Sequence, residues 1–202
     1  KYSSSVCYGA LFIVAALLLD YTGKTSRGLY KEAQQQLLEN MAYSDELTGL
    51  SNRRKCDEVV EKLLDGDADF TLISMDLNLL KYYNDTYGHE KGDALLRSFA
   101  SVLREAFPAA LAIARVGGDE FHVVLPDREQ EELREDLTCL LKCLYEKNEQ
   151  NKELHLSTAV GCVQRSEFLD NVDIRMLYQE ADRRMYVHKQ KMKEKNPELY
   201  RR

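Results

Sequence analysis

Two carboxylates, Asp119 and Glu120, follow a Gly-Gly pair in the stretch 115–121 (RVGGDEF). Apolar runs at 110–114 and 121–125 predict two strands joined as a hairpin around this stretch. Gly117 and Gly118 can take positive φ and, because they lack side chains, a bulky ligand can approach the backbone there. Two acids at a tight turn can gather a divalent cation and phosphate. Taken alone, the pattern fits a solvated turn equally well.

A third carboxylate, Asp76, lies near the end of the run 70–77 (FTLISMDL). The nearly continuous apolar sequence of this run predicts a central strand covered on both faces. A buried carboxylate is costly unless it is paired or binds metal, so Asp76 is either a hydrogen-bonded structural residue or part of a site. In a palm-type sheet the strand and the hairpin are neighbours. Asp76, Asp119 and Glu120 could then hold Mg²⁺ (or Mn²⁺) that binds nucleotide phosphates.

The segment 78–93 supplies groups that could bind a nucleotide. Lys81 and Asn84 fall on one side of a predicted short helix, and Lys81 could neutralise phosphate charge together with the basic end of a helix over 172–193. Asn84 and Asp93 offer an amide and a carboxylate, which can recognise guanine. A carboxylate accepts from N1–H and N2–H₂ of guanine but would be unpaired against adenine.

The predicted elements indicate an α+β fold with an antiparallel-rich central sheet flanked by helices, palm-type or ferredoxin-like, preceded by an N-terminal helix. Gly49 ends that first helix, and Ser51 or Asn52 caps the next one, which runs to about Leu64. His89 is expected in a loop between Gly88 and Gly92. The remaining predicted elements are a helix over 94–107 capped by Asp93, a helix over 129–145 and a strand over 154–162.

Composition narrows the class of protein. The 202 residues suggest one domain of ordinary size plus something extra, and 44% apolar residues suffice for a core. A net charge of −6 argues against a nucleic-acid-binding surface. The five cysteines are odd in number and contain no C-x-x-C, so we expect free thiols in a reducing compartment rather than disulfides or zinc.

The N-terminal residues leave alternatives open. The uncharged stretch 6–19 (VCYGALFIVAALLL) could be the end of a membrane helix, an element of an upstream domain, or the core of a signal peptide. Lys24 and Arg27 would place the downstream residues in the cytoplasm. An apolar stripe over 25–44 suits either a short parallel coiled coil or an amphipathic helix docked on its own domain. Because the chain does not begin with Met, we expect it to be a fragment of a longer protein.

Four stretches together resemble the GGDEF domain of the diguanylate cyclase family, and they occur in the family's order. They are 45–54 (DELTGLSNRR), 76–93 (DLNLLKYYNDTYGHEKGD), 115–121 (RVGGDEF) and 181–189 (ADRRMYVHK). The resemblance divides the chain into an apolar segment (1–20), a signalling helix (21–44), the GGDEF domain (45–195) and a tail (196–202). It implies a cytoplasmic catalytic domain under an upstream sensor, anchored to the inner membrane.

The resemblance also implies an activity, the condensation of two GTP into cyclic di-GMP with release of two pyrophosphates by a homodimer. Asp76 and Asp119 would ligate the metal with the Leu77 carbonyl, and Glu120 would lie beside the metal and the attacking 3′-hydroxyl. Either Asp119 or Glu120 would accept the proton. The substrate-binding residues that it implies are Asn84 and Asp93 for guanine, Lys81 and Lys189 for phosphate, and His89, Gly117, Gly118 and Lys193 around them.

Several positions depart from the family pattern. Asn78 stands where the family usually has Asp, Leu80 replaces a Phe, and Lys193 replaces an Arg that would bind phosphate bidentately. The family's inhibitory product site, R-x-x-D, maps to Pro108 and Leu111, so we expect no feedback inhibition there. Two other functions remain open, a silent module that binds GTP and signals to a partner, and a cyclase that makes another dinucleotide. The retained acids argue against the silent module, and Asp93 favours guanine.

Overall fold

The computed structural model describes residues 30–31, 34, 42–66, 68–168, 172–195 and 197. The chain divides into two units, Lys1–Ala42 and Tyr43–Arg202. In the first, Tyr30, Lys31, Gln34 and Ala42 are helical, as the stripe predicts, but the stretch 6–19 and most of 25–44 lie outside the described residues. None of the helices in the described ranges is long and apolar enough to cross a membrane.

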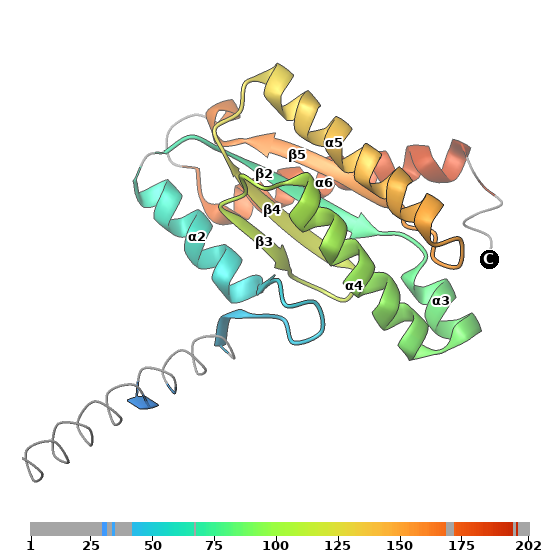
Figure 1. The fold of residues 1–202 in the computed structure, drawn as a ribbon. Helices are drawn as coiled ribbons and strands as arrows, with labels where there is room; N and C mark the ends of the chain where they lie inside the picture. The colour runs from blue at the N-terminus through green and yellow to red at the C-terminus, as the bar shows by residue number, and fades with distance from the viewer. Residues whose placement is uncertain are drawn as a thin grey trace, which may run out of the picture. The chain divides into compact units, whose positions relative to one another are not determined.

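A five-stranded sheet organises the second unit, with strand order β1-β3-β4-β2-β5 (Figure 1). Its short first strand pairs in parallel with β3, and every other pair is antiparallel. The strands are β1 (Ser51–Asn52), β2 (Phe70–Leu77), β3 (Ala112–Arg115), β4 (Glu120–Pro126) and β5 (Thr158–Gln164). This arrangement confirms the predicted α+β fold with an antiparallel-rich sheet.

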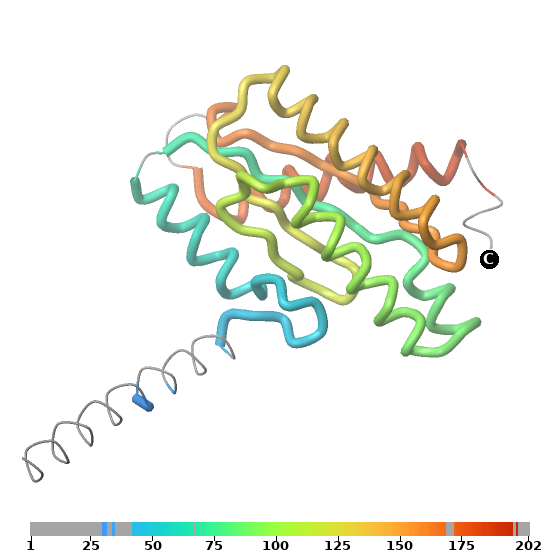
Figure 2. The backbone as a smooth tube through the Cα atoms, viewed as in Figure 1, coloured from blue at the N-terminus to red at the C-terminus, as the bar shows by residue number. Residues whose placement is uncertain are grey.

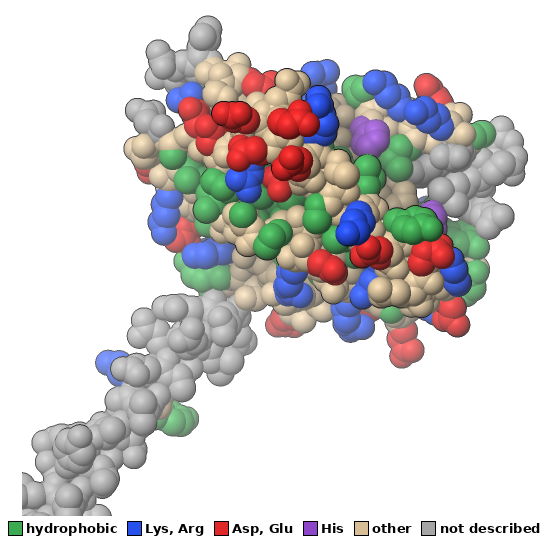
Figure 3. Space-filling model, turned by 45° about the horizontal axis from the view of Figure 1, so that its top comes forward, with side chains coloured by type: hydrophobic (Ala, Val, Ile, Leu, Met, Phe, Trp, Pro, Cys, Tyr) green, Lys and Arg blue, Asp and Glu red, His purple; other side chains and the backbone are tan. Residues whose placement is uncertain are grey.

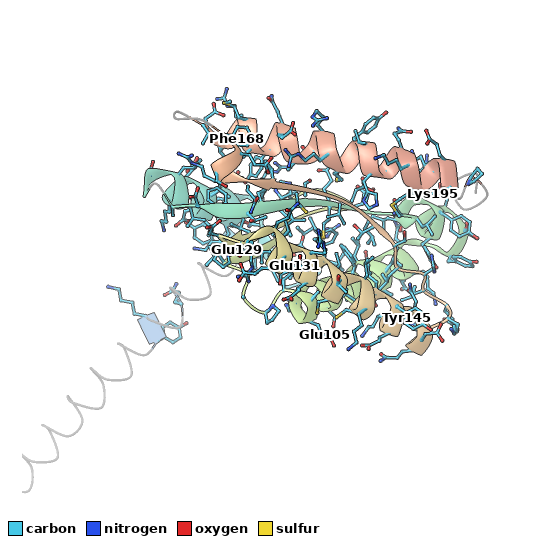
Figure 4. All side chains as sticks on the ribbon, turned by 90° about the horizontal axis from the view of Figure 1, so that it is seen from above. Glu105, Glu129, Glu131, Tyr145, Phe168 and Lys195 are labelled. Atoms are coloured by element: carbon cyan, nitrogen blue, oxygen red, sulfur yellow. The ribbon has the colours of Figure 1, made fainter. Side chains whose placement is uncertain are left out.

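Helices cover both faces of the sheet, with α4 and α5 on one face and α6 on the other (Figure 4). The apolar side chains of α2 join those of α6 in the second core. The helices are α2 (Arg53–Asp65), α3 (Leu80–Tyr87), α4 (His89–Ala106), α5 (Gln130–Gln150) and α6 (Ile174–Lys195), with a 3-10 turn η1 (Arg165–Glu167). Glu131, Glu132 and Glu135 lie exposed on α5, where Figure 3 shows acidic side chains gathered, as expected of a solvated face.

The central strand β2 is buried along its whole length, as the sequence predicts. Because side chains alternate along a strand, Ile73 and Met75 enter the core beneath α4 and α5, whereas Leu72 enters the core with α2 and α6. Asn52 caps α2 by accepting from the Lys55 N–H at 3.1 Å, which confirms one of the two predicted caps. These cores fix the end of β2, where Asp76 lies.

Two predicted boundaries are wrong. The helix expected from residue 94 begins at His89, because Gly88, with φ 87°, ends α3 and leads directly into α4 (Figure 2). Asp93 is therefore inside α4 and is no cap, and His89 is helical rather than in a loop. The strand expected from residue 154 begins at Thr158, because side chains bind the preceding backbone. The N–H of His155 donates to the Tyr83 hydroxyl at 2.8 Å, and that of Leu156 to Asn148 Oδ1 at 2.7 Å.

A buried histidine makes stability depend on pH. His122 in β4 is 4% exposed and packs on Tyr178, with 4.8 Å between ring centroids. Burial lowers the pKa of His122 from 6.5 to about 4, although the charge of Asp182 opposes this shift. The unfolded chain therefore takes up a proton below about pH 6.5 that the folded chain refuses until about pH 4, so stability is lost as the pH falls through this window.

Replacing His122 with phenylalanine should remove this loss. Between pH 7 and pH 4.5 we expect the free energy of unfolding to fall by roughly 3 kcal/mol less in His122→Phe than in the wild type. Urea unfolding at the two pH values measures the difference. Equal pH dependence in the two proteins would show that His122 titrates normally.

Candidate active site

Asp76 occupies the penultimate position of β2, opposite Glu120 of β4 and Ala159 of β5. Its side chain accepts a hydrogen bond from Lys189 Nζ of α6 at 2.6 Å through Oδ2. The other oxygen, Oδ1, is buried and has no hydrogen-bond partner in the described structure. Burial raises the pKa of Asp76; the Lys189 ammonium opposes the shift and the nearby Asp119 carboxylate adds to it.

The hairpin lies directly against the end of β2. The N–H of Leu77 donates to the Asp119 carbonyl at 2.8 Å, and the N–H of Val116 to the Glu120 carbonyl at 2.9 Å, which closes the turn. Asp76 and Asp119 therefore meet in one cavity of about 310 Å³. Its lining is Asp76, Leu77, Asn78, Leu79, Leu80, Lys81, Tyr82, Asp119, Lys189 and Lys193.

The cavity brings together the predicted metal ligands Asp76, Leu77 and Asp119 with the predicted phosphate-binding lysines. Lys81 comes from α3, whereas Lys189 and Lys193 come from the last turns of α6, one turn apart. Three ammonium groups around two carboxylates give the cavity a net positive lining, which suits a polyphosphate. Lys189 and Lys193 are more than a hundred positions from Asp76 and Lys81 in sequence, and the contacts of β2 with α6 bring them together.

Glu120 does not line this cavity. Its side chain lies over Gly117, where an added Cβ would be 2.6 Å from Glu120 Oε2, and its carboxylate is 3.9 Å from Arg53 Nη2. No group of three His, Cys, Asp or Glu side chains gathers at metal-binding distance among the described residues. Of the three predicted acids, Asp76 and Asp119 thus line the cavity, and Glu120 lies outside its lining.

The oxygen atoms present nevertheless fit a divalent cation. An orphaned buried oxygen, Asp76 Oδ1, next to a second carboxylate is a donor set that Mg²⁺ or Mn²⁺ prefers over softer metals. Leaving such an atom without a partner is costly, and a bound cation would relieve that cost.

The two glycines of the turn do not use the positive φ that glycine allows. Positive φ occurs among the described glycines at Gly49 and Gly88, and neither Gly117 nor Gly118 has it. At Gly117 an added Cβ would meet the Glu120 side chain, which would have to shift. At Gly118 an added Cβ would meet no atom within 4 Å, so the structure itself imposes no demand for glycine there.

Arg115, which is ion-paired with Asp45, stabilises the hairpin turn. Arg115 donates from Nη2 to the Gly118 carbonyl at 2.8 Å, and its Nη1 is 3.3 Å from Asp45 Oδ2. Burial opposes ionisation of Asp45, but hydrogen bonds from Thr48 and the charge of Arg115 outweigh it and lower the pKa of this carboxyl. Arg53 Nε adds a bond to the Val116 carbonyl at 3.1 Å. Sequence reasoning missed these roles, although all four residues lie within the stretches 45–54 and 115–121.

The predicted guanine-binding residues lie on α3 and α4, outside the cavity lining. Asn84 faces Gly92, where an added Cβ would come within 1.9 Å of Asn84 Oδ1, so this glycine allows the two helices to approach. Asp93 follows Gly92 and is partly exposed, with Arg97 Nη2 4.0 Å from its Oδ2. His89 is exposed in the first turn of α4. Asn84 of α3 thus lies against Gly92 of α4, the residue that precedes Asp93.

Comparisons with known proteins agree with this geometry. A family model described as diguanylate cyclase, GGDEF domain, matches residues 42–195. The chain is 27% identical over 187 residues to "Probable diguanylate cyclase DgcJ" of Escherichia coli (strain K12), covering 89% of this chain and 35% of that protein. It is 38% identical over 91 residues to the response regulator PleD of Caulobacter vibrioides, covering 43% and 20%. The chain therefore spans less than half the length of these curated relatives.

Solved structures share the fold. The coiled coil and GGDEF domain of DgcB from Caulobacter crescentus, in complex with c-di-GMP, is 25% identical with a TM-score of 0.66, covering 88% of this chain and 94% of that one. A microbial GGDEF domain described with bis-(3,5)-cyclic di-GMP is 28% identical with a TM-score of 0.60, covering 75% and 93%.

Proposed function

This chain belongs to the diguanylate cyclase, GGDEF domain family, and we propose that it condenses two GTP into cyclic di-GMP with release of two pyrophosphates. The observation that carries the proposal is the cavity at the end of β2. There an unpartnered Asp76 oxygen lies beside Asp119 under three lysines, an arrangement suited to a metal-bound triphosphate.

Each residue then has a chemical role. Lys81, Lys189 and Lys193 bind the phosphates and balance their charge, while Asn84 and Asp93 bind the guanine edge and so select GTP over ATP. The 3′-hydroxyl of one GTP attacks the α-phosphorus of the other, its proton passes to Asp119 or Glu120, and the bond to pyrophosphate breaks. Gly118 lets the nucleotide lie against the hairpin, and His89 borders the base.

Asp76 Oδ1, the Asp119 carboxylate and the Leu77 carbonyl would hold Mg²⁺ or Mn²⁺, and Glu120 would be a further ligand. When bound, the cation polarises the phosphate oxygens and stabilises charge at the reacting phosphorus. The hydrogen bond from Lys189 orients Asp76 and opposes the burial that raises the pKa of this carboxyl. Removing that ammonium should therefore weaken both metal and phosphate binding.

Two copies of the chain are needed, because each site binds one GTP and two must face each other. We place control of their pairing in the segment before residue 45, which would connect the catalytic unit to an upstream sensor and to the membrane. The apolar stretch 6–19 supports the membrane connection. Detergent dependence of a chain extended upstream tests it; an extended chain that stays in solution without detergent would contradict it.

Incubation of the purified chain with GTP and Mg²⁺, followed by chromatography of the nucleotides, tests the activity. Cyclic di-GMP is the expected product. Tight GTP binding without any product would favour the alternative of a silent signalling module, and a product containing adenine from mixed GTP and ATP would favour the alternative of a mixed-dinucleotide cyclase.

Gly118 offers a selective test of where the nucleotide lies. Because an added Cβ meets no protein atom within 4 Å and φ is not positive, Gly118→Ala should leave the thermal midpoint unchanged. We expect the rate of cyclic di-GMP formation to fall about tenfold or more, since the methyl group would enter the space of the bound nucleotide. Calorimetry and the product assay measure the two effects. An unchanged rate would place the nucleotide away from the hairpin backbone.

We expect the chain to have no inhibitory site for cyclic di-GMP at residues 108–111. Pro108 and Leu111 are exposed and carry no group that binds guanine or phosphate. Titration with cyclic di-GMP should therefore give at most inhibition competitive with GTP. As a control, the double change Pro108→Arg and Leu111→Asp restores the motif and should introduce non-competitive inhibition. Strong non-competitive inhibition of the wild type, mapped to 108–111, would refute the expectation.

A further inference from the structure

A second cavity lies on the other side of the turn that leads into α3. It measures about 460 Å³, within the range of small-molecule sites. Its lining is Leu79, Tyr82, Tyr83, Tyr87, Lys91, Lys152, Glu153 and His155. We call it the tyrosine pocket. None of the catalytic, metal-binding or guanine-binding residues proposed above belongs to its lining.

Three tyrosines of α3 form the apolar wall of this pocket. Their ring centroids are 5.7–5.9 Å apart in all three pairs. The Tyr83 hydroxyl fixes the facing loop, because it accepts from the His155 N–H at 2.8 Å and donates to the Glu153 carbonyl at 3.3 Å. The wall and the loop are therefore held together before any ligand binds. Aromatic faces of this kind stack on planar rings.

The rim carries two lysines whose carboxylate partners are exposed. Two lysines, Lys91 and Lys152, face one acid of the lining, Glu153. Lys91 pairs with Glu153 and Lys152 with Glu149, each at 2.5 Å, but both acids are more than half exposed. Exposed ion pairs contribute little, so an ammonium group can exchange its carboxylate partner for that of a ligand. An acidic group on a planar ring would fit both wall and rim.

The tyrosine pocket shares part of its wall with the catalytic cavity. Leu79 and Tyr82 line both. Leu79 has φ 69°, the one positive φ among the described residues other than glycine, and no side chain caps α3 there. A leucine in this left-handed conformation is strained, so neighbouring packing must maintain it. Leu79 is two residues from the proposed metal-binding carbonyl of Leu77 and two from Lys81.

We propose that the tyrosine pocket is an effector site for a planar aromatic acid, and that its occupant acts on the catalytic cavity through Leu79 and Tyr82. The ring stacks on the tyrosines and the acid binds Lys91 and Lys152. By packing on Leu79 the ligand shifts the turn that positions Leu77 and Lys81, and so changes the affinity for GTP. This second part rests on the proposed function, whereas binding to the pocket does not.

Calorimetric titration with 2-naphthoate, beside its neutral analogue 2-naphthalenemethanol, tests the pocket. The acid should bind about tenfold more tightly than the alcohol, because it gains charge-assisted hydrogen bonds. Lys152→Gln should remove most of that preference. Lys142→Gln is the matched control, since Lys142 is an equally exposed lysine of α5 paired with Glu146. No saturable binding, or a preference that Lys152→Gln leaves unchanged, would overturn the site.

The effect on the catalytic cavity is measured as GTP affinity with and without saturating 2-naphthoate. We expect at least about a threefold change in the wild type and in Lys142→Gln, whereas Lys152→Gln should need about tenfold more naphthoate to reach the same change. An identical GTP affinity in the presence and absence of naphthoate would overturn the effector role. If the chain does not bind GTP at all, the proposed function fails, and the naphthoate titrations alone decide whether the pocket is a ligand site.

Discussion

Replacing Asp119 with alanine is expected to lower the rate of cyclic di-GMP formation by about a thousandfold or more. The change removes one of the two carboxylates of the cavity and with it a proposed metal ligand and a candidate proton acceptor. The fold should persist, because the hydrogen bond that joins the turn to β2 is made by the Asp119 carbonyl and not by its side chain. The product assay and thermal unfolding measure the two effects.

Asp76→Asn distinguishes an effect on activity from an effect on stability more clearly than Asp119→Ala does. It should abolish the activity as completely as Asp119→Ala, yet it should not lower the thermal midpoint at neutral pH. Burial raises the pKa of Asp76, so the folded chain holds this proton more tightly than the unfolded chain does. The contribution of Asp76 to stability therefore declines as the pH rises through its raised pKa, and asparagine has no such decline.

Thermal midpoints of the wild type and of Asp76→Asn, measured at low and neutral pH, test the direction of this pH dependence. The wild type should lose stability relative to Asp76→Asn as the pH rises. A variant that is markedly less stable than the wild type at neutral pH would show that the Asp76–Lys189 pair holds the fold together rather than serving the site. A variant that keeps its activity would contradict the proposed role of Asp76.

Gly161→Ala is expected to have the largest effect on stability. A Cβ at Gly161 of β5 would lie 2.1 Å from the Ala181 carbonyl oxygen and 2.3 Å from the Met185 backbone nitrogen. Because both are backbone atoms of α6, the helix must move away from the sheet. We expect a loss of about 3 kcal/mol, a fall of roughly 6–12 °C in the midpoint for a chain of this size.

The same displacement should weaken GTP binding, because α6 carries Lys189 to Asp76. Thermal unfolding and GTP titration of Gly161→Ala measure both consequences. Gly118→Ala is the control for the thermal midpoint alone, because there an added methyl group meets no protein atom. A midpoint within about one degree of the wild type would mean that β5 and α6 pack less closely than the structure has them.

The sequence predicts best where local pattern and burial agree. The continuous apolar run of β2 predicts a central strand, and Asp76 at its end predicts a site, because a buried charge needs a partner. Helix and strand boundaries fail where tertiary contacts override local signals. Asp93 looks like a cap, but Gly88 starts α4 earlier, and Leu154 and Leu156 alternate like a strand although Tyr83 and Asn148 bind the backbone around them.

The candidate site shows the same division. The sequence pattern predicts that Asp119 lies at a turn. It does not predict that Glu120 lies over Gly117, or that the Arg115–Asp45 ion pair stabilises the hairpin. The Arg115–Asp45 pair joins residues 70 positions apart, whereas the Glu120–Gly117 contact is local to the hairpin. The tyrosine pocket is equally hidden, since its wall and rim come from α3, α4 and the loop after α5. Such features appear only when distant elements are packed together.

The most direct test of the proposed activity is the nucleotide product of the wild-type chain from GTP and Mg²⁺, measured beside Asp119→Ala in the same assay. We predict cyclic di-GMP and pyrophosphate in a ratio of one to two from the wild type and neither from the variant. Equal amounts of cyclic di-GMP from both proteins, or no product from a wild-type chain that binds GTP, would contradict the proposal.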